Sequence, residues 1–161
     1  MKTDYFSQFP HAHLVSKDGT ASFKICTYNY AYPEADNIYD ADWHRNYLIF
    51  TLPAFKAEID EIMLEGNLLT YYIEELRAFT ALKINEVFFE PTEPYFGLTF
   101  SFLSKRKKRI GVEGYVQYPV GIGAVLQFEF ETGVTDVVRF INGLEDILAA
   151  FPAIKEGEDS D

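Results

Sequence analysis

The chain has 161 residues, of which 48% are hydrophobic, and it contains 15 Phe and 11 Tyr. A chain of this length and composition is expected to fold as one domain around its own core. Its formal net charge of −11 argues against nucleic acid as a direct partner, because phosphates are bound by basic surfaces. The single cysteine, Cys26, excludes an internal disulfide.

No apolar run approaches the roughly 18 residues that a membrane-spanning helix needs. The first residues, Met-Lys-Thr-Asp-Tyr-Phe, lack the apolar segment of a secretory signal. We therefore expect a cytoplasmic protein that does not contact a membrane.

The first half of the chain predicts three strands and one helix. Residues 1–22 are polar and are expected to be irregular. The elements are predicted at residues 23–32, 47–52 and 55–63 for the strands and 71–83 for the helix. Pro53 interrupts the second and third strands and indicates a hairpin between them. For the helix, Thr70 is the expected N-cap. The inward face is marked by Ile73, Leu76, Phe79 and Thr80.

The second half alternates apolar and polar residues and then changes to helical spacing. Strands are predicted at residues 86–90, 95–103, 110–118 and 123–131, and a helix at 135–151. Phe96, Leu98 and Phe100 share one strand face by this alternation. Phe100 and Phe128 are predicted to face the last helix.

This order of elements excludes alternating βαβ units and favours an α+β fold with an antiparallel sheet. We predict about six to seven strands, with a meander in the C-terminal half, packed with two main helices. One domain is predicted over residues 1–152, followed by an acidic disordered tail at 153–161. No internal repeat is evident in the sequence.

Two histidine-containing segments are candidates for chemistry. His11 and His13 lie on one side of an extended segment, but no third ligand is near them in sequence, so we expect no metal site. Asp40, Asp42 and His44 cluster around Trp43 and suggest an acid–base pair in a cleft, as in a small enzyme or ligand-binding domain. The structural interpretation places Trp43 in the core, with Asp40 or Asp42 bonded to backbone amides.

The distribution of charge points to a partner. The basic run Lys105–Arg109 contributes +5 and the last six residues contribute −4, which leaves −12 on the rest of the chain. The basic run lies between two predicted strands, so we interpret it as a solvated hairpin tip, with phosphate or anionic-lipid binding as the alternative. An acidic body attracts basic proteins. The carboxylates expected to bind such a partner are Asp36, Asp40, Asp42, Glu58, Asp60 and Glu90.

Several motifs, spread over about residues 30–152, together resemble one family. They are Asp36-Asn-Ile-Tyr-Asp-Ala-Asp-Trp43, Leu69-Thr-Tyr-Tyr-Ile-Glu-Glu-Leu76, Leu126-Gln-Phe-Glu-Phe-Glu-Thr132 and the closing Ala150-Phe-Pro152. This order resembles the WapI-type immunity proteins of bacterial polymorphic-toxin systems. Asp42 stands where that family usually has Asn, and His44 where it usually has Leu.

The resemblance implies a non-enzymatic inhibitor that binds a co-encoded toxin domain, often a nuclease, and that needs no cofactor. The acidic charge agrees, because a toxin that grips nucleic acid is basic and an acidic inhibitor is steered towards it. Two alternatives stay open from the sequence: the small enzyme or ligand-binding domain built around Asp40, Asp42 and His44, and a structural domain that shares only the fold.

Overall fold

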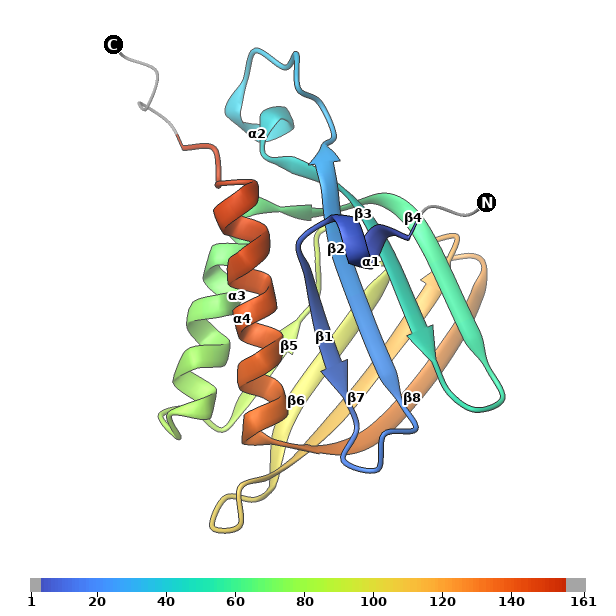
Figure 1. Cartoon of the computed structure of the whole chain (residues 1–161), viewed down its shortest axis with the longest axis vertical. Coiled ribbons are helices and arrows are strands. Elements are labelled where there is room, and N and C mark those ends of the chain that lie inside the picture. The colour runs from blue at the N-terminus through green and yellow to red at the C-terminus, as the bar shows by residue number, and fades with distance from the viewer. Residues whose placement is uncertain (1–3, 156–161) are drawn as a thin grey trace.

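Two four-stranded antiparallel sheets, each followed by a long helix, make up residues 4–155, the part of the chain that this computed structural model describes (Figure 1). The first unit consists of β1 (His11–Val15), β2 (Ser22–Tyr30), β3 (Trp43–Thr51), β4 (Lys56–Glu65) and α3 (Gly66–Thr80). The second consists of β5 (Glu86–Phe89), β6 (Phe96–Ser104), β7 (Arg109–Tyr118), β8 (Ala124–Gly133) and α4 (Val134–Ala150). Two short helices, α1 (Tyr5–Gln8) and α2 (Ile38–Ala41), lie in the first unit.

The predicted α+β class is confirmed, with a difference in the sheets. The strands form two sheets in the orders β1-β2-β3-β4, here called sheet A, and β5-β6-β7-β8, called sheet B. Every neighbouring pair is antiparallel. The chain is therefore two consecutive ββββα units, a repeat of structure that the sequence did not reveal.

The N-terminal part of the chain differs most from the prediction. Residues predicted as irregular contain α1 and β1, and β1 pairs with β2 over its whole length. The helix predicted at 71–83 begins earlier, at Gly66, and ends at Thr80. Thr70 is not its N-cap, because the Thr70 hydroxyl lies inside the helix and donates to the Gly66 carbonyl at 2.9 Å.

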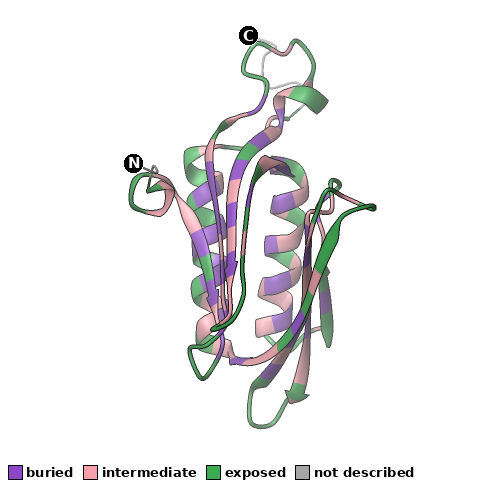
Figure 2. Cartoon of the chain, turned by 90° about the vertical axis from the view of Figure 1, so that its right-hand side faces the viewer, coloured by how far each residue is buried: buried purple, intermediate pink, exposed green. Residues whose placement is uncertain are grey.

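Sheets A and B face each other, and α3 and α4 run side by side along one edge of the pair (Figures 1 and 2). Aromatic rings join the two inner faces: Phe50 of β3 stacks on Phe128 of β8 with ring centroids 3.9 Å apart. Phe100 faces α4 as predicted, 6.3 Å from the Phe140 ring. Phe128 instead faces sheet A, where its ring stacks on Phe50 of β3.

The helices bury one stripe each in this core. Residues at spacings of three and four fill the stripes: Leu69, Ile73, Leu76 and Phe79 in α3, and Val137, Phe140, Ile141, Leu144 and Ile147 in α4. On the solvent side, Arg77 of α3 pairs with Glu145 of α4 at 2.8 Å and donates to the Asn142 side chain. Buried apolar area therefore holds the helices together, and the exposed ion pair adds little.

The chain after α4 folds back onto the first unit. The Tyr30 hydroxyl donates to the Pro152 carbonyl at 2.6 Å, and Asn67 donates to the Ile154 carbonyl at 2.8 Å. Residues 153–155, placed in the tail by the sequence, are thus part of the folded unit. Residues 156–161 of the predicted tail lie outside the described residues.

Candidate functional site

Asp42 serves the fold, as one of the two interpretations from sequence expected. It is only 4% exposed, and its Oδ2 accepts from the Asn67 backbone amide and side chain, each at 2.8 Å. Its Oδ1 accepts from the Ile154 amide at 2.9 Å. Asp42 therefore caps the first turn of α3 from a distance and ties down the segment after α4. Its carboxylate is not on the surface, where partner binding would require it.

His44 is fully buried, which sequence reasoning did not expect. Its Nδ1 lies 3.0 Å from the Thr27 hydroxyl, while Nε2 has no hydrogen-bond partner among the described residues. Burial lowers the pKa of His44 to about 4, partly offset by the nearby Asp42 carboxylate. Trp43, predicted to be mostly buried, is partly buried at the start of β3 and is not among the residues of the buried core.

Asp40, Asp42 and His44 do not converge on a cleft. Asp40 is exposed on α2, where its amide and carboxylate both bond the Asn37 side chain, at 2.9 and 3.0 Å. A hollow of about 380 Å³ near α2 is lined by Asp42 but by neither Asp40 nor His44. An acid–base pair needs both groups within reach of one substrate, and this arrangement does not provide it.

The other predicted partner-binding carboxylates are scattered. Asp36 lies exposed in the loop before α2, and Glu58 and Asp60 are exposed on β4. Asp60 accepts from the Tyr28 hydroxyl at 2.6 Å and the Tyr5 hydroxyl at 3.3 Å, and Glu58 pairs with Lys56 at 2.7 Å. Glu90 is half-buried and accepts from the Tyr115 hydroxyl.

The N-terminal helix α1 covers the part of the outer face of sheet A around Cys26. The Tyr5 ring lies 4.7 Å from Tyr47 and 4.9 Å from Tyr28, and the Lys24 ammonium lies 5.4 Å from the Phe6 centroid. Cys26 lies between Lys24 and Tyr28 on this face and is fully buried. Burial raises the pKa of its thiol to about 11, so Cys26 is an inert structural cysteine.

The neighbouring histidines on β1 also have structural contacts. His13 Nε2 lies 2.7 Å from the Ser22 hydroxyl, and the His11 ring packs edge-on against Phe6. Within residues 4–155, no three metal-ligating side chains come together.

The outer face of sheet B is open. Cross-strand pairing places one row of residues directly side by side across its four strands: Phe88, Thr99, Glu113 and Glu129. The next row contains Gly97, Tyr115 and Gln127. These rows line a hollow of about 590 Å³. Figure 2 shows the long helices only on the other side of this sheet.

Glu113 and Glu129 were not among the partner-binding residues predicted from the sequence. Alternation along the strands does put both of them on an outward face. What the sequence did not supply is the register of β7 and β8, which places the two carboxylates directly opposite each other. Among the described residues, neither has a hydrogen bond or an ion pair, and both are exposed.

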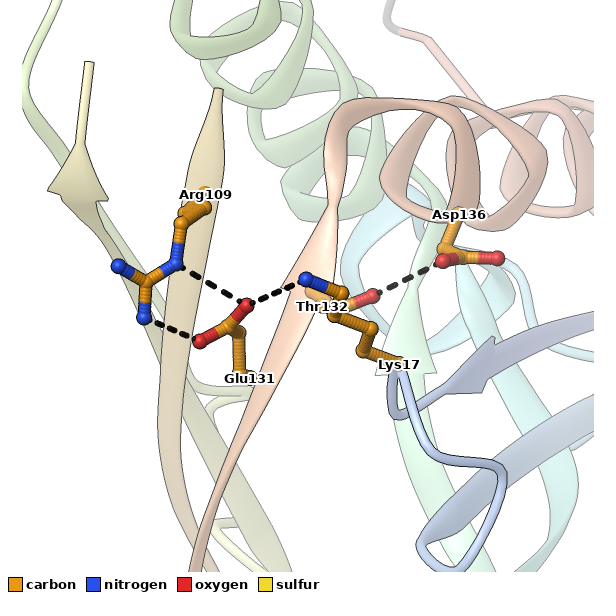
Figure 3. A network of polar contacts seen from close by, with 5 residues as sticks. All are labelled: Lys17, Arg109, Glu131, Thr132 and Asp136. Atoms are coloured by element: carbon orange, nitrogen blue, oxygen red, sulfur yellow. Dashed lines mark hydrogen bonds and ion pairs between the residues drawn. The ribbon is translucent and has the colours of Figure 1, made fainter. Parts of the chain in front are cut away.

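A polar network closes the end of sheet B next to the basic run (Figure 3). Arg109 donates to both oxygens of Glu131, at 2.6 and 3.2 Å, and Lys17 reaches the same carboxylate at 3.4 Å. Hydrogen bonds from Arg109 are the main reason why the pKa of Glu131 falls to about 2. The Thr132 hydroxyl lies 3.4 Å from Asp136 at the start of α4.

The basic run forms the β6–β7 hairpin tip, as interpreted from the sequence. Lys105 donates to the Asn85 side chain at 2.6 Å. Arg106, Lys107 and Lys108 are exposed around the turn.

Comparisons with known proteins complete the description. No helix of the described residues is long and apolar enough to span a membrane. A search of curated proteins found no match. Among solved structures, one titled "Crystal structures of trypanosoma bruciei MRP1/MRP2" aligns with 10% sequence identity over 90% of this chain and 88% of that chain. Its TM-score of 0.48 is too low to carry an argument about this chain.

The match to a protein family is more decisive. Residues 13–152 match the family described as "Immunity protein WapI-like family". The match runs from β1 to the end of α4 and therefore includes both ββββα units. The chain belongs to the WapI-like immunity protein family.

Proposed function

We propose that this protein is a cytoplasmic, non-enzymatic inhibitor that binds and neutralises a basic, nuclease-like toxin domain encoded next to it. Membership of the WapI-like family supports the immunity function and a toxin as partner. The basic character of the toxin is our inference from charge. A nuclease surface that holds phosphates is basic, and an acidic protein that occupies it blocks the substrate and gains speed of association.

The observation that carries this proposal is the acidic charge of the folded part. Apart from the basic hairpin tip and the last six residues, the chain carries −12. The ion pairs among the described residues involve four acids, Glu58, Glu131, Asp136 and Glu145, and Glu131 takes two of the cations. Many outward carboxylates, such as Asp36 and Glu113, are left to face solvent and raise the attraction for a basic partner.

The small-enzyme alternative has less support. Asp42 already accepts three hydrogen bonds, and His44 is buried beneath the segment after α4, with its ring against Tyr30 and Phe151. Neither side chain is placed to exchange a proton with a bound substrate.

The test is the rate of association with the toxin domain encoded by the neighbouring gene, measured against ionic strength. The unmodified protein should inhibit the toxin, and its association rate should fall steeply as salt rises. Asp36→Lys combined with Asp40→Lys should slow association and weaken the salt dependence. Deletion of residues 156–161, which removes a charge of −4, should change affinity little because the folded part carries most of the charge.

Two results would contradict the proposal. One is an association rate that does not respond to salt, which would show that attraction between an acidic inhibitor and a basic toxin surface does not drive association. The other is loss of binding on deletion of residues 156–161 while the two lysine substitutions have no effect, which would place recognition in the tail.

A further inference from the structure

The outer faces of the two sheets differ in what covers them. On sheet A, α1 and its aromatic side chains close the face over Cys26. On sheet B, the outward side chains of β5 and β6 stay accessible: Phe88 is 52% exposed and Leu103 is 55% exposed. These two side chains place apolar area on a face that also carries polar groups, a combination that protein interfaces use.

The outward positions of β6 beside the hollow on sheet B carry small residues. Gly97 has no side chain, and a Cβ there would lie 2.5 Å from the Tyr115 ring, which takes that space. Thr99 and Ser101 follow on the same side of the strand. Larger side chains stand around this floor, with Phe88 on β5 and Gln127 on β8. The hollow of about 590 Å³ has room for protruding side chains of another molecule.

Charge identifies what fits there. Glu113 and Glu129 lie directly opposite each other on β7 and β8, an arrangement of like charges that destabilises a sheet. One row along, the protein neutralises Glu131 with Arg109 and Lys17. Among the described residues, no cation pairs with Glu113 or Glu129, although Arg109 lies on β7, the same strand as Glu113. A like-charge pair kept at a cost to stability is typical of a functional surface.

We propose that the open outer face of sheet B is the toxin-docking surface, and that Glu113 and Glu129 together receive an arginine or lysine side chain of a basic toxin segment seated in the hollow. This inference rests on the proposed function and adds the location of the interface. Two carboxylates on one row match the fork of an arginine. Phe88 provides the apolar edge that interfaces combine with such polar contacts.

The test uses two kinds of variant with the inactivated toxin domain encoded by the neighbouring gene. Glu113→Gln with Glu129→Gln removes the charges, and we expect the Kd to rise by about tenfold or more. The matched control is Glu74→Gln with Asp146→Asn, which makes the same change in net charge at exposed positions of α3 and α4. The control should change the Kd by less than about threefold, because charges away from the docking surface act on long-range steering and the association rate rather than on contacts made in the complex.

Thr99→Arg separates docking from general folding. Thr99 is paired with Glu113 across β6 and β7, so an arginine there supplies the missing cation from within the chain. We expect a higher melting temperature together with weaker toxin binding, a combination that a folding defect does not produce. Ala149→Arg adds the same charge at an exposed position in the last turn of α4 and should leave binding nearly unchanged.

The outcomes distinguish this inference from the function on which it rests. If the unmodified protein does not bind the neighbouring toxin domain, the proposed function falls and this surface with it. If it binds, but the sheet B variants bind as well as their controls do, the toxin docks elsewhere and only the surface is wrong. Loss of binding that is confined to Asp36→Lys with Asp40→Lys would move the interface to the loop before α2.

Discussion

Sheet A and sheet B have the same arrangement of strands, but their outer faces differ in what lies on them. Tyr28 and Tyr47 on sheet A hold α1 against the sheet through ring contacts, and Asp60 accepts a hydrogen bond from Tyr28 and another from Tyr5. On sheet B, no helix of the described residues lies over the outer face (Figure 2), and a hollow lined by Thr99, Glu113 and Glu129 stays open. Two ββββα units with the same order of elements thus differ in their outward residues, and those residues decide where α1 packs on sheet A and which face of sheet B stays open.

The largest expected effect compares the two faces of sheet B at adjacent residues. Phe128 points inward and stacks on Phe50, whereas Gln127 points outward into the hollow. Phe128→Ala should cost about 3–5 kcal/mol of unfolding free energy because it leaves a cavity between the sheets. Gln127→Ala should change it by less than about 0.5 kcal/mol. Urea unfolding of both variants checks this, and a cost below about 1 kcal/mol for Phe128→Ala would mean that the faces are assigned backwards.

An ionisable group on an inner face should make the protein sensitive to acid. His44 has a folded-state pKa of about 4 against an ordinary 6.5, so the unfolded chain binds the proton first as pH falls. The stability that neutral His44 preserves is complete above pH 6.5 and is lost between 6.5 and 4, by roughly 3 kcal/mol. Comparing urea unfolding at pH 7 and pH 4.5 for the protein and for His44→Gln measures it. Equal acid sensitivity in both would show that His44 does not carry the effect.

Removing the α1 rings that pack on sheet A should have a smaller effect on stability and should raise the reactivity of the Cys26 thiol. Tyr5→Ala with Phe6→Ala should cost about 1–2 kcal/mol, since both rings are only half-buried. Cys26, inert beneath α1, should then react faster with a thiol reagent. Phe55→Ala, which removes an exposed ring at the β3–β4 turn, is the control and should leave Cys26 slow to react. A Cys26 that reacts equally in all three proteins would show that α1 does not seal this face.

The sequence was most informative where structure depends on neighbouring residues. Alternation from residue 95 onwards placed β6, β7 and β8 within two residues of their observed bounds. It also separated Phe100 on the inner face from Thr99 on the outer one. These patterns are strong because each strand buries one face only, so its side chains must alternate.

What the sequence did not reveal depends on residues far apart in the chain. The start of α3 at Gly66 has poor helix formers and is capped by Asp42, a residue 25 positions from its Asn67 partner. The opposition of Glu113 and Glu129 depends on the pairing register. Similarly, β1 is a strand because it pairs with β2 and because Ala12 and Leu14 are buried in the core. Its own sequence is short and contains two histidines, so it did not predict a strand.

The contrast between the two outer faces is tested most directly by hydroxyl-radical footprinting of side chains, with and without the toxin domain encoded by the neighbouring gene. Phe88 and Leu103 are exposed on sheet B in the free protein and should become protected in the complex. Tyr5 and Phe6 on sheet A are also partly accessible and should keep the same modification rate, because the proposed docking surface lies on sheet B. Protection of Phe55 or Tyr39, with Phe88 and Leu103 unchanged, would contradict the account.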